Sequence, residues 1–204
     1  TANLDIAASS VGGNLTLTSG NASGITDSGT VTVGGNLAVT TDANNGEINL
    51  GTLAVDGTVA LTTNGNGAAT VVNDAGLNFA ASTVGGNLAA TATTGNMIDS
   101  GALAISGTTE LTTSANNATI TLNNTNAFTG AVTITTNDDS GNNASATIDG
   151  GTTALIIAAS TIDGDLTVTS GNASGITDSG TVTVGGELIA ITDANSGVIS
   201  LGTT

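Results

Sequence analysis

Apolar and small polar residues alternate along most of this chain, in short runs that each follow a glycine. In VGGNLTL (11–17), the apolar residues Val11, Leu15 and Leu17 are separated by glycine, asparagine and threonine. Side chains at every second position of a β-strand point to one face, so this pattern predicts strands with one buried face. Eight such runs occur, at residues 11–17, 33–39, 55–61, 84–90, 105–111, 128–134, 162–168 and 184–190.

The glycine that opens each run recurs at a nearly constant spacing. The anchor glycines are Gly13, Gly35, Gly57, Gly86, Gly107, Gly130, Gly164 and Gly186, and the steps between them are 22, 22, 29, 21, 23, 34 and 22 residues. Such short strands bury their apolar face only by stacking on neighbouring units. We therefore expect an all-β fold, a right-handed parallel β-solenoid of about eight coils that stack in register.

The chain is expected to form a single solenoid segment, 1–204, within a longer rod or filament. The expected coils are 1–29, 30–51, 52–76, 77–101, 102–124, 125–151, 152–180 and 181–204. A three-coil super-repeat lies above this period, because LDIAASSV (4–11), LNFAASTV (77–84) and LIIAASTI (155–162) open every third coil. In keeping with it, the eighteen residues 18–35 return unchanged at 169–186.

Composition rules out several ordinary classes of protein. Charged residues make up 8% of the chain and aromatic residues 1%, too few for the usual surface and core of a compact globule. Disorder is also disfavoured, because 38% of the residues are apolar and many are β-branched. The sequence shows neither an initiator Met, nor a signal peptide, nor a long apolar run, so we expect a mature product or fragment without a membrane span.

The charge is uniformly negative. Sixteen Asp and Glu residues and no Lys or Arg give a formal net charge of −16. Nucleic acids and anionic membranes attract proteins through Lys and Arg, so we expect neither as a partner. The missing basic residues also deny trypsin a cleavage site, which would suit an extracellular protein.

GGNLTLTSG, with its alternating Leu and Thr, resembles the repetitive shaft of large secreted bacterial adhesins of the filamentous-haemagglutinin type, exported by two-partner secretion. The resemblance covers nearly the whole chain through composition and period. It implies a secreted, extracellular or surface-attached structural rod, whose receptor contacts, for example to host or surface glycans, would lie in regions outside this chain.

Catalysis has little raw material here. Without His, Cys, Lys, Arg or Tyr, the chain offers no ordinary general base near neutral pH and no activated serine, so we expect no enzyme. A carboxylate pair can hydrolyse glycosides, and the close pairs are Asp138 with Asp139 and Asp163 with Asp165. Both lie at expected corners, where Asp favours turns.

Calcium is the one cofactor that the acidic chain suggests, since Ca²⁺ binds carboxylate and carbonyl oxygens. The weak candidate ligands are the Asp-Ser-Gly corners at Asp27, Asp99 and Asp178, one in each super-repeat. They are expected three coils apart in one column, which at about 4.8 Å per coil is roughly 14 Å, too far for them to share one ion. Solvated turn carboxylates are the simpler interpretation.

Two further patterns concern the outer surface. An outward threonine ladder is expected five residues after the anchors, at Thr18, Thr40, Thr62, Thr91, Thr112, Thr135 and Thr169. Cross-strand threonine pairing explains a ladder, and ice or surface binding is the alternative. Asn-x-Ser/Thr sequons, possible glycosylation sites in a secreted protein, occur at Asn14, Asn21, Asn117, Asn123, Asn143 and Asn172.

The sequence thus leaves three non-catalytic functions open. The first is a passive shaft of a bacterial surface adhesin or extracellular fibre. The second is a subunit that stacks end to end on identical chains, since strands at an open sheet edge readily add further strands. The third is an ice- or surface-binding solenoid.

Overall fold

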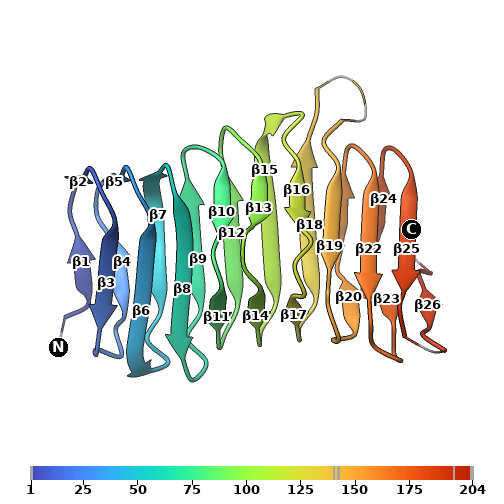
Figure 1. The fold of residues 1–204 in the computed structure, drawn as a ribbon, viewed down its shortest axis with the longest axis horizontal. Coiled ribbons are helices and arrows are strands. Elements are labelled where there is room, and N and C mark those ends of the chain that lie inside the picture. Colours follow the sequence, from blue (N-terminus) through green and yellow to red (C-terminus); the bar gives the residue numbers. More distant parts are fainter. Residues whose placement is uncertain (1, 140, 142, 195, 203–204) are drawn as a thin grey trace.

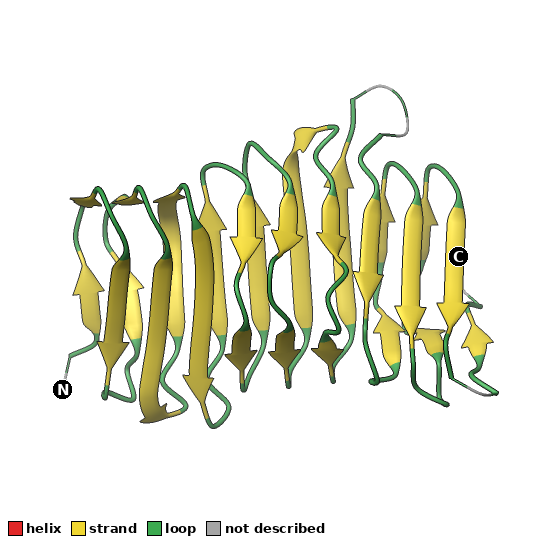
Figure 2. Ribbon diagram, viewed as in Figure 1, coloured by secondary structure: helices red, strands yellow, loops and turns green. Residues whose placement is uncertain are grey.

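Two parallel sheets face each other along the whole molecule, and the chain winds between them (Figure 1). This computed structural model describes residues 2–139, 141, 143–194 and 196–202. Within those ranges every regular element is a strand and none is a helix (Figure 2). The blue N-terminal and red C-terminal turns lie at opposite ends of the stack (Figure 1).

The described strands form a 14-stranded sheet A and a 12-stranded sheet B. Sheet A contains β1 (Leu4–Ile6), β4 (Ile25–Asp27), β7 (Ile48–Val55), β9 (Ala69–Asn73), β12 (Leu88–Ala92), β15 (Thr109–Asn116), β18 (Val132–Asn137), β20 (Leu155–Ile157), β23 (Ile176–Asp178) and β26 (Ile199–Ser200), with β2 (Ser9–Val11), β5 (Val31–Val33), β21 (Ser160–Ile162) and β24 (Val182–Val184) beside them. Sheet B contains β3 (Leu15–Ser19), β6 (Leu37–Asn44), β8 (Thr58–Asn64), β10 (Leu77–Phe79), β13 (Met97–Asp99), β16 (Ile120–Leu122), β19 (Ala146–Asp149), β22 (Leu166–Ser170) and β25 (Leu188–Thr192), with β11 (Ser82–Val84), β14 (Leu103–Ile105) and β17 (Ala127–Phe128).

Every strand pair is parallel, and each strand lies beside its counterpart one turn later. Paired residues are separated by as few as 19 residues, for Ala69 and Leu88, and as many as 26, for Ile120 and Ala146. The fold is therefore the expected parallel β-solenoid, with about nine turns of about 22 residues. At about 4.8 Å per turn, nine turns give a rod of roughly 43 Å.

The core is one thin apolar layer between the sheets. It includes the inward residues of the predicted alternating runs, for example Leu37, Val39 and Val59, each no more than 1% exposed. Both aromatic side chains, Phe79 and Phe128, are fully buried within this layer. Because the same cluster continues from turn to turn, each turn is held by its two neighbours.

Polar side chains close the corners. Near the ends of four strands a buried threonine donates its hydroxyl to a carbonyl across the turn: Thr41 to Gly46, Thr63 to Gly67, Thr113 to Ala118 and Thr136 to Ala144. Left-handed backbone recurs at one corner of each super-repeat, at Asn45, Asn117 and Ser196, with φ of 62°, 63° and 64°. Asparagine tolerates this conformation better than most residues.

The predicted stacking of all eight anchors in one column is wrong at two places. We call the strand that follows each anchor glycine an anchor strand; these are β3, β6, β8, β12, β15, β18, β22 and β25. The first three and the last two lie in sheet B, but β12, β15 and β18 lie in sheet A. From β3 the chain makes three turns to reach β10 and then half a turn to β12, so one super-repeat spans about three and a half turns.

The extra half turn explains both the unequal spacing and the turn count. The 29-residue step from Gly57 to Gly86 contains β9, and the 34-residue step from Gly130 to Gly164 contains β19. Each of these strands carries the chain once more across the rod, so each long step covers one and a half turns. The solenoid therefore has about nine turns for its eight anchor glycines, whereas eight coils were expected.

Candidate functional site: the junctions between super-repeats

The second and third super-repeats each begin where a bent pair of short strands stacks on one straight anchor strand, β10 with β11 on β8 and β20 with β21 on β18. At the first of these junctions, Phe79 of β10 pairs with Val59, and Thr83 of β11 pairs with Thr62. The chain bends between β10 and β11, so the straight strand β8 has backbone groups there that no strand can satisfy. A buried N–H without a partner is costly.

A serine side chain supplies the missing acceptor. Ser82 Oγ accepts the N–H of Leu61 at 3.0 Å and donates to the carbonyl of Ala80 at 2.8 Å. At the second junction, Ser160 Oγ accepts the N–H of Ile134 at 3.0 Å and donates to Ala158 at 2.8 Å. Both serines are 5% exposed. The sequence marked them as part of the super-repeat, and the structure gives their role.

Two buried asparagines also form hydrogen bonds with backbone groups of neighbouring strands, and sequence reasoning missed them. Asn73 Oδ1 accepts the N–H of Val55 at 2.8 Å, and its Nδ2 donates to the carbonyls of Val55 and Gly76 at 3.0 and 2.7 Å. Its amide thus replaces a peptide group of a neighbouring strand. Asn126 likewise accepts the N–H of Leu103 and donates to Asp99. In a chain rich in exposed asparagine, no local signal distinguishes these two.

The three calcium candidates are not brought together. Asp27 and Asp178 lie at the ends of β4 and β23 in sheet A, whereas Asp99 ends β13 in sheet B on the opposite face, so the single-column arrangement is wrong. Asp27 accepts the N–H groups of Gly51 and Thr52 at 2.9 and 2.7 Å. The carboxylates therefore cap the backbone of the following turn.

Asp99 and Asp178 follow the same rule. Asp99, 8% exposed, accepts the N–H of Asn123 at 3.0 Å and the Nδ2 of Asn126 at 2.8 Å, and Asp178 accepts the N–H of Gly202 at 3.2 Å. The described part of the chain contains no group of three or more acidic side chains placed to hold a metal ion.

The acidic pairs considered for hydrolysis also bind the chain itself. Asp163 Oδ2 accepts the backbone N–H of Asp138 at 2.8 Å, and Asp165 Oδ1 accepts that of Glu187 at 2.7 Å. Asp139 accepts Nδ2 of Asn116 at 2.7 Å. These side chains join successive turns at the corners where the sequence placed them.

The seven threonines form separate ladders on two faces instead of one column. In sheet B, Thr18, Thr40 and Thr62 pair in order and continue into Thr83. In sheet A, Thr91, Thr112 and Thr135 pair in order and continue into Thr161 and Thr183. Thr169 lies apart, between Asp149 and Ile191. The half-turn shift causes this division.

All six sequon asparagines lie outside the strands, although Asn14 directly precedes β3, which contains the other two residues of its sequon. The asparagines Asn14, Asn117, Asn123 and Asn143 are exposed. Asn21 and Asn172 are half-buried, and their Nδ2 groups donate to the carbonyls of Ala2 and Thr152 at 2.6 and 2.8 Å. An attached sugar would therefore meet less obstruction at the first four positions.

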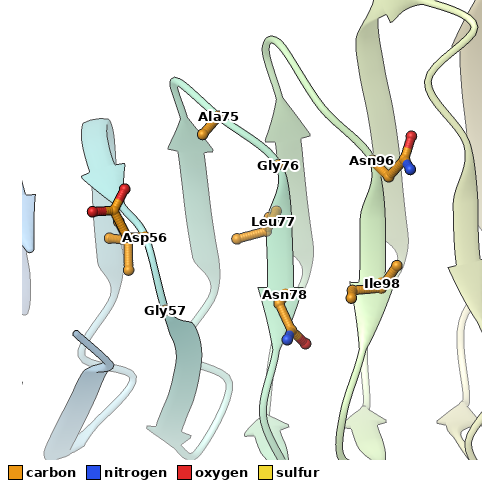
Figure 3. Close-up of a pocket in the computed structure, with 9 residues that line it drawn as sticks. Asp56, Gly57, Ala75, Gly76, Leu77, Asn78, Asn96 and Ile98 are labelled. Atoms are coloured by element: carbon orange, nitrogen blue, oxygen red, sulfur yellow. The ribbon is translucent and has the colours of Figure 1, made fainter. Parts of the chain in front are cut away.

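One shallow, open hollow lies beside the first junction (Figure 3). It has a volume of about 390 Å³ and its lining includes Asp56, Asn78, Asn96 and Ile98. Ile98 is 41% exposed, while Oδ1 of Asn78 is buried without a hydrogen-bond partner. One carboxylate, two amides and apolar surface can bind a polar group, but they provide no nucleophile with an activating base.

Comparison with known proteins finds one family. Residues 1–50, 66–135 and 141–204 match the model of a family described as repeats of unknown function (DUF5649). The chain belongs to this repeat family. One matched segment overlaps each super-repeat, and the second and third segments begin before their super-repeats, so that they include β9 and β19. Neither the curated proteins nor the solved structures contain a match. The described residues include no helix able to cross a membrane.

Proposed function

We propose that this DUF5649 chain is a structural, non-catalytic rod that spans distance in a secreted bacterial adhesin or extracellular fibre. The observation that supports this most directly is the parallel ladder that continues through about nine turns over one apolar layer. In such an array each turn is stabilised only by its neighbours, so length can grow without a larger globular core.

The polar side chains support the same interpretation. The acidic and amide groups that catalysis or metal binding would need are instead bound to the backbone of an adjacent turn, as in Asp27, Asp99 and Asn73. The net charge of −16 would keep such rods soluble and apart. Partners would then be neighbouring solenoid turns, with receptor binding, for example to host or surface glycans, in regions outside residues 1–204.

Two measurements test this proposal. Small-angle X-ray scattering of the dilute chain should give an elongated particle whose length matches about nine turns, roughly 43 Å plus the end side chains. Antibodies raised against the chain should label intact cells of the source bacterium. A compact scattering profile would contradict the rod, and labelling that requires permeabilised cells would contradict the extracellular location.

A further inference from the structure

Three Asn-Gly steps lie at the corners that follow β6 and β8, at residues 45–46, 64–65 and 66–67. Asparagine is a thermolabile residue. It is most labile before glycine, because glycine has no Cβ to keep its backbone nitrogen away from the asparagine side chain. All three steps have this local sequence, so the fold decides which of them can react.

At two of these steps the glycine nitrogen is already engaged. The N–H of Gly46 donates to the carbonyl of Ala43 at 3.1 Å, and the N–H of Gly67 donates to the carbonyl of Asn64 at 3.2 Å. Each of these bonds closes a β-turn, and both glycines are buried. Neither nitrogen can turn toward the preceding asparagine unless its corner opens.

The third step leaves its glycine nitrogen unengaged. Gly65 is the first central residue of the turn that Asn64 and Gly67 close, and its φ of 64° is a left-handed value that glycine adopts without steric cost. Both Asn64 and Gly65 are exposed. Within the described part of the chain, no group accepts a hydrogen bond from the N–H of Gly65. This nitrogen is therefore free to approach the adjacent side-chain amide.

We propose that Asn64 is a site of spontaneous covalent modification, deamidation through a succinimide ring. The backbone nitrogen of Gly65 attacks Cγ of Asn64, a bond forms between these two atoms, and the bond from Cγ to Nδ2 breaks. Nδ2 leaves as ammonia and carries away the proton of the Gly65 N–H. Water then opens the ring at one of its two carbonyls. Opening at Cγ gives aspartate, whereas opening at the backbone carbonyl gives isoaspartate, in which the chain continues through Cγ.

One hydrogen bond restrains the reacting side chain. Nδ2 of Asn64 donates to the carbonyl of Asp42 in the preceding turn at 2.9 Å. An exposed bond of this kind should slow the reaction by about fivefold, since it breaks readily in water. At the other two steps a buried corner must open first, and Oδ1 of Asn45 also accepts the N–H of Asn66 at 2.8 Å. Such openings are rarer, so Asn64 should react first.

Isoaspartate at position 64 would disturb the first junction. Asn64 ends β8, the anchor strand on which β11 stacks, and its carbonyl accepts the N–H of Asn45 at 3.0 Å as well as that of Gly67. Gly85 in the next turn lies so close that an added Cβ would overlap the carbonyl oxygen of Gly65. An extra methylene in the chain and a new carboxylate would displace these contacts. Modified chains should lose hydrogen-exchange protection at the N–H groups of Asn45 and Gly67.

Mass spectrometry of the folded chain, incubated for weeks at neutral pH, tests the site. A protease that cleaves before aspartate releases residues 56–73, which contain both Asn64 and Asn66. We expect a gain of about 1 Da on Asn64, with isoaspartate detected by an isoaspartyl methyltransferase. Asn66 in the same peptide, and Asn45, should react at least about tenfold more slowly. In the chain unfolded in urea, all three asparagines should react at similar rates.

Asn64→Gln is the matched variant, because it keeps an amide at this corner but would have to form a six-membered ring, which closes far more slowly. It should abolish the modification in the folded chain and preserve hydrogen-exchange protection during incubation. Modification of Asn45 or Asn66 as fast as Asn64 in the folded chain would overturn the proposal. So would an Asn64 that stays intact while the unfolded chain reacts at all three positions. Scattering from the fresh chain judges the proposed rod separately.

Discussion

The two identical eighteen-residue copies, 18–35 and 169–186, fold alike but are not equally buried. Each contributes a short pair to sheet A, β4 with β5 and β23 with β24. Val33 is fully buried, while its counterpart Val184 is only partly buried. The first copy lies between complete turns, whereas the second lies beneath the last described turn. Identical sequence thus gives identical strands, and the neighbouring turns decide how much each strand is stabilised.

The two copies lie in the same sheet because of the number of turns between them. The two copies are two super-repeats apart, or about seven turns, so the half turns cancel. The corresponding segment of the middle super-repeat, β13 with β14, lies one super-repeat away and appears in sheet B. The sheet that a segment joins therefore depends on the number of turns that precede it, and not on the segment's own sequence.

The largest expected difference between the copies comes from one glycine. Gly24 and Gly175 have φ of 74° and 67°, and an added Cβ would overlap the carbonyl oxygen of Glu47 or Val198 in the next turn. Gly24→Ala should lower the free energy of unfolding by about 4 kcal/mol. Gly175→Ala should cost about 2 kcal/mol, mostly from the left-handed backbone, because the overlapping backbone of Val198 belongs to the last described turn and is held by a described neighbour on one side only.

Urea denaturation followed by circular dichroism measures both glycine variants, and hydrogen exchange locates the damage. For Gly175→Ala, lost protection should be confined to β25 and β26. Gly12→Ala is the control, since an added Cβ there meets nothing within 4 Å. Equal losses at Gly24 and Gly175 would show that neighbouring turns do not set the difference.

The Asp-Ser-Gly corners give the next largest effect. Asp99 is buried and accepts the N–H of Asn123 and the Nδ2 of Asn126. In Asp99→Asn, an amide NH₂ group would replace one of the accepting oxygens and face these donors. We expect a loss of about 3 kcal/mol. Asp27→Asn, at the partly exposed corner of sheet A, should cost about 1 kcal/mol. The same urea titration checks both, and a larger loss at Asp27 would contradict the burial argument.

The junction serines should show a smaller, position-dependent effect. Ser82→Ala leaves the N–H of Leu61 buried without its acceptor, at a cost of about 2 kcal/mol. Ser9→Ala removes only an exposed bond to Ala7 and should change the stability of the monomer by less than about 0.5 kcal/mol. Thermal unfolding of the dilute chain provides the comparison. A loss at Ser9→Ala as large as that at Ser82→Ala would contradict the view that the accepted N–H makes the serine important.

The threonine ladders should give the smallest effect. Thr40 and Thr112 occupy equivalent positions on opposite faces, in sheets B and A. Replacing either with Val keeps the β-branched shape, so each change should be within about 0.5 kcal/mol. Ice-growth assays on the unaltered chain should show no thermal hysteresis, and a measurable effect there would revive the surface-binding hypothesis.

Sequence reasoning predicted the strands well because a period of two is a direct record of which face is buried. The inward residues Leu37, Val39 and Val59 were identified from alternation alone, and all are in the core. The half turn could not be read from spacing, since a 29-residue step fits either one turn with a long loop or one and a half tighter turns. Two separate strand signals, ATVVN and LNF, between Gly57 and Gly86 were the available clue.

The candidate site was less accessible from sequence. Ser82 and Ser160 were visible as a pattern, but their acceptor role depends on a bent pair lying over a straight strand. Asn73 carries no pattern, because its partner Val55 is adjacent only after the chain has wound a full turn. Such bonds depend on three-dimensional register, which local sequence does not encode.

Each super-repeat spans about three and a half turns, and the extra half turn has a consequence for how proteins of this family can change length. Gaining or losing one super-repeat by recombination would rotate all later turns by half a turn relative to the earlier ones, so that their surfaces lie on the opposite side of the molecule. Gaining or losing units in pairs would preserve orientation. Whether the number of super-repeats is even or odd therefore matters. Homologues whose super-repeat counts differ by an even number should have corresponding surfaces on the same side of the molecule.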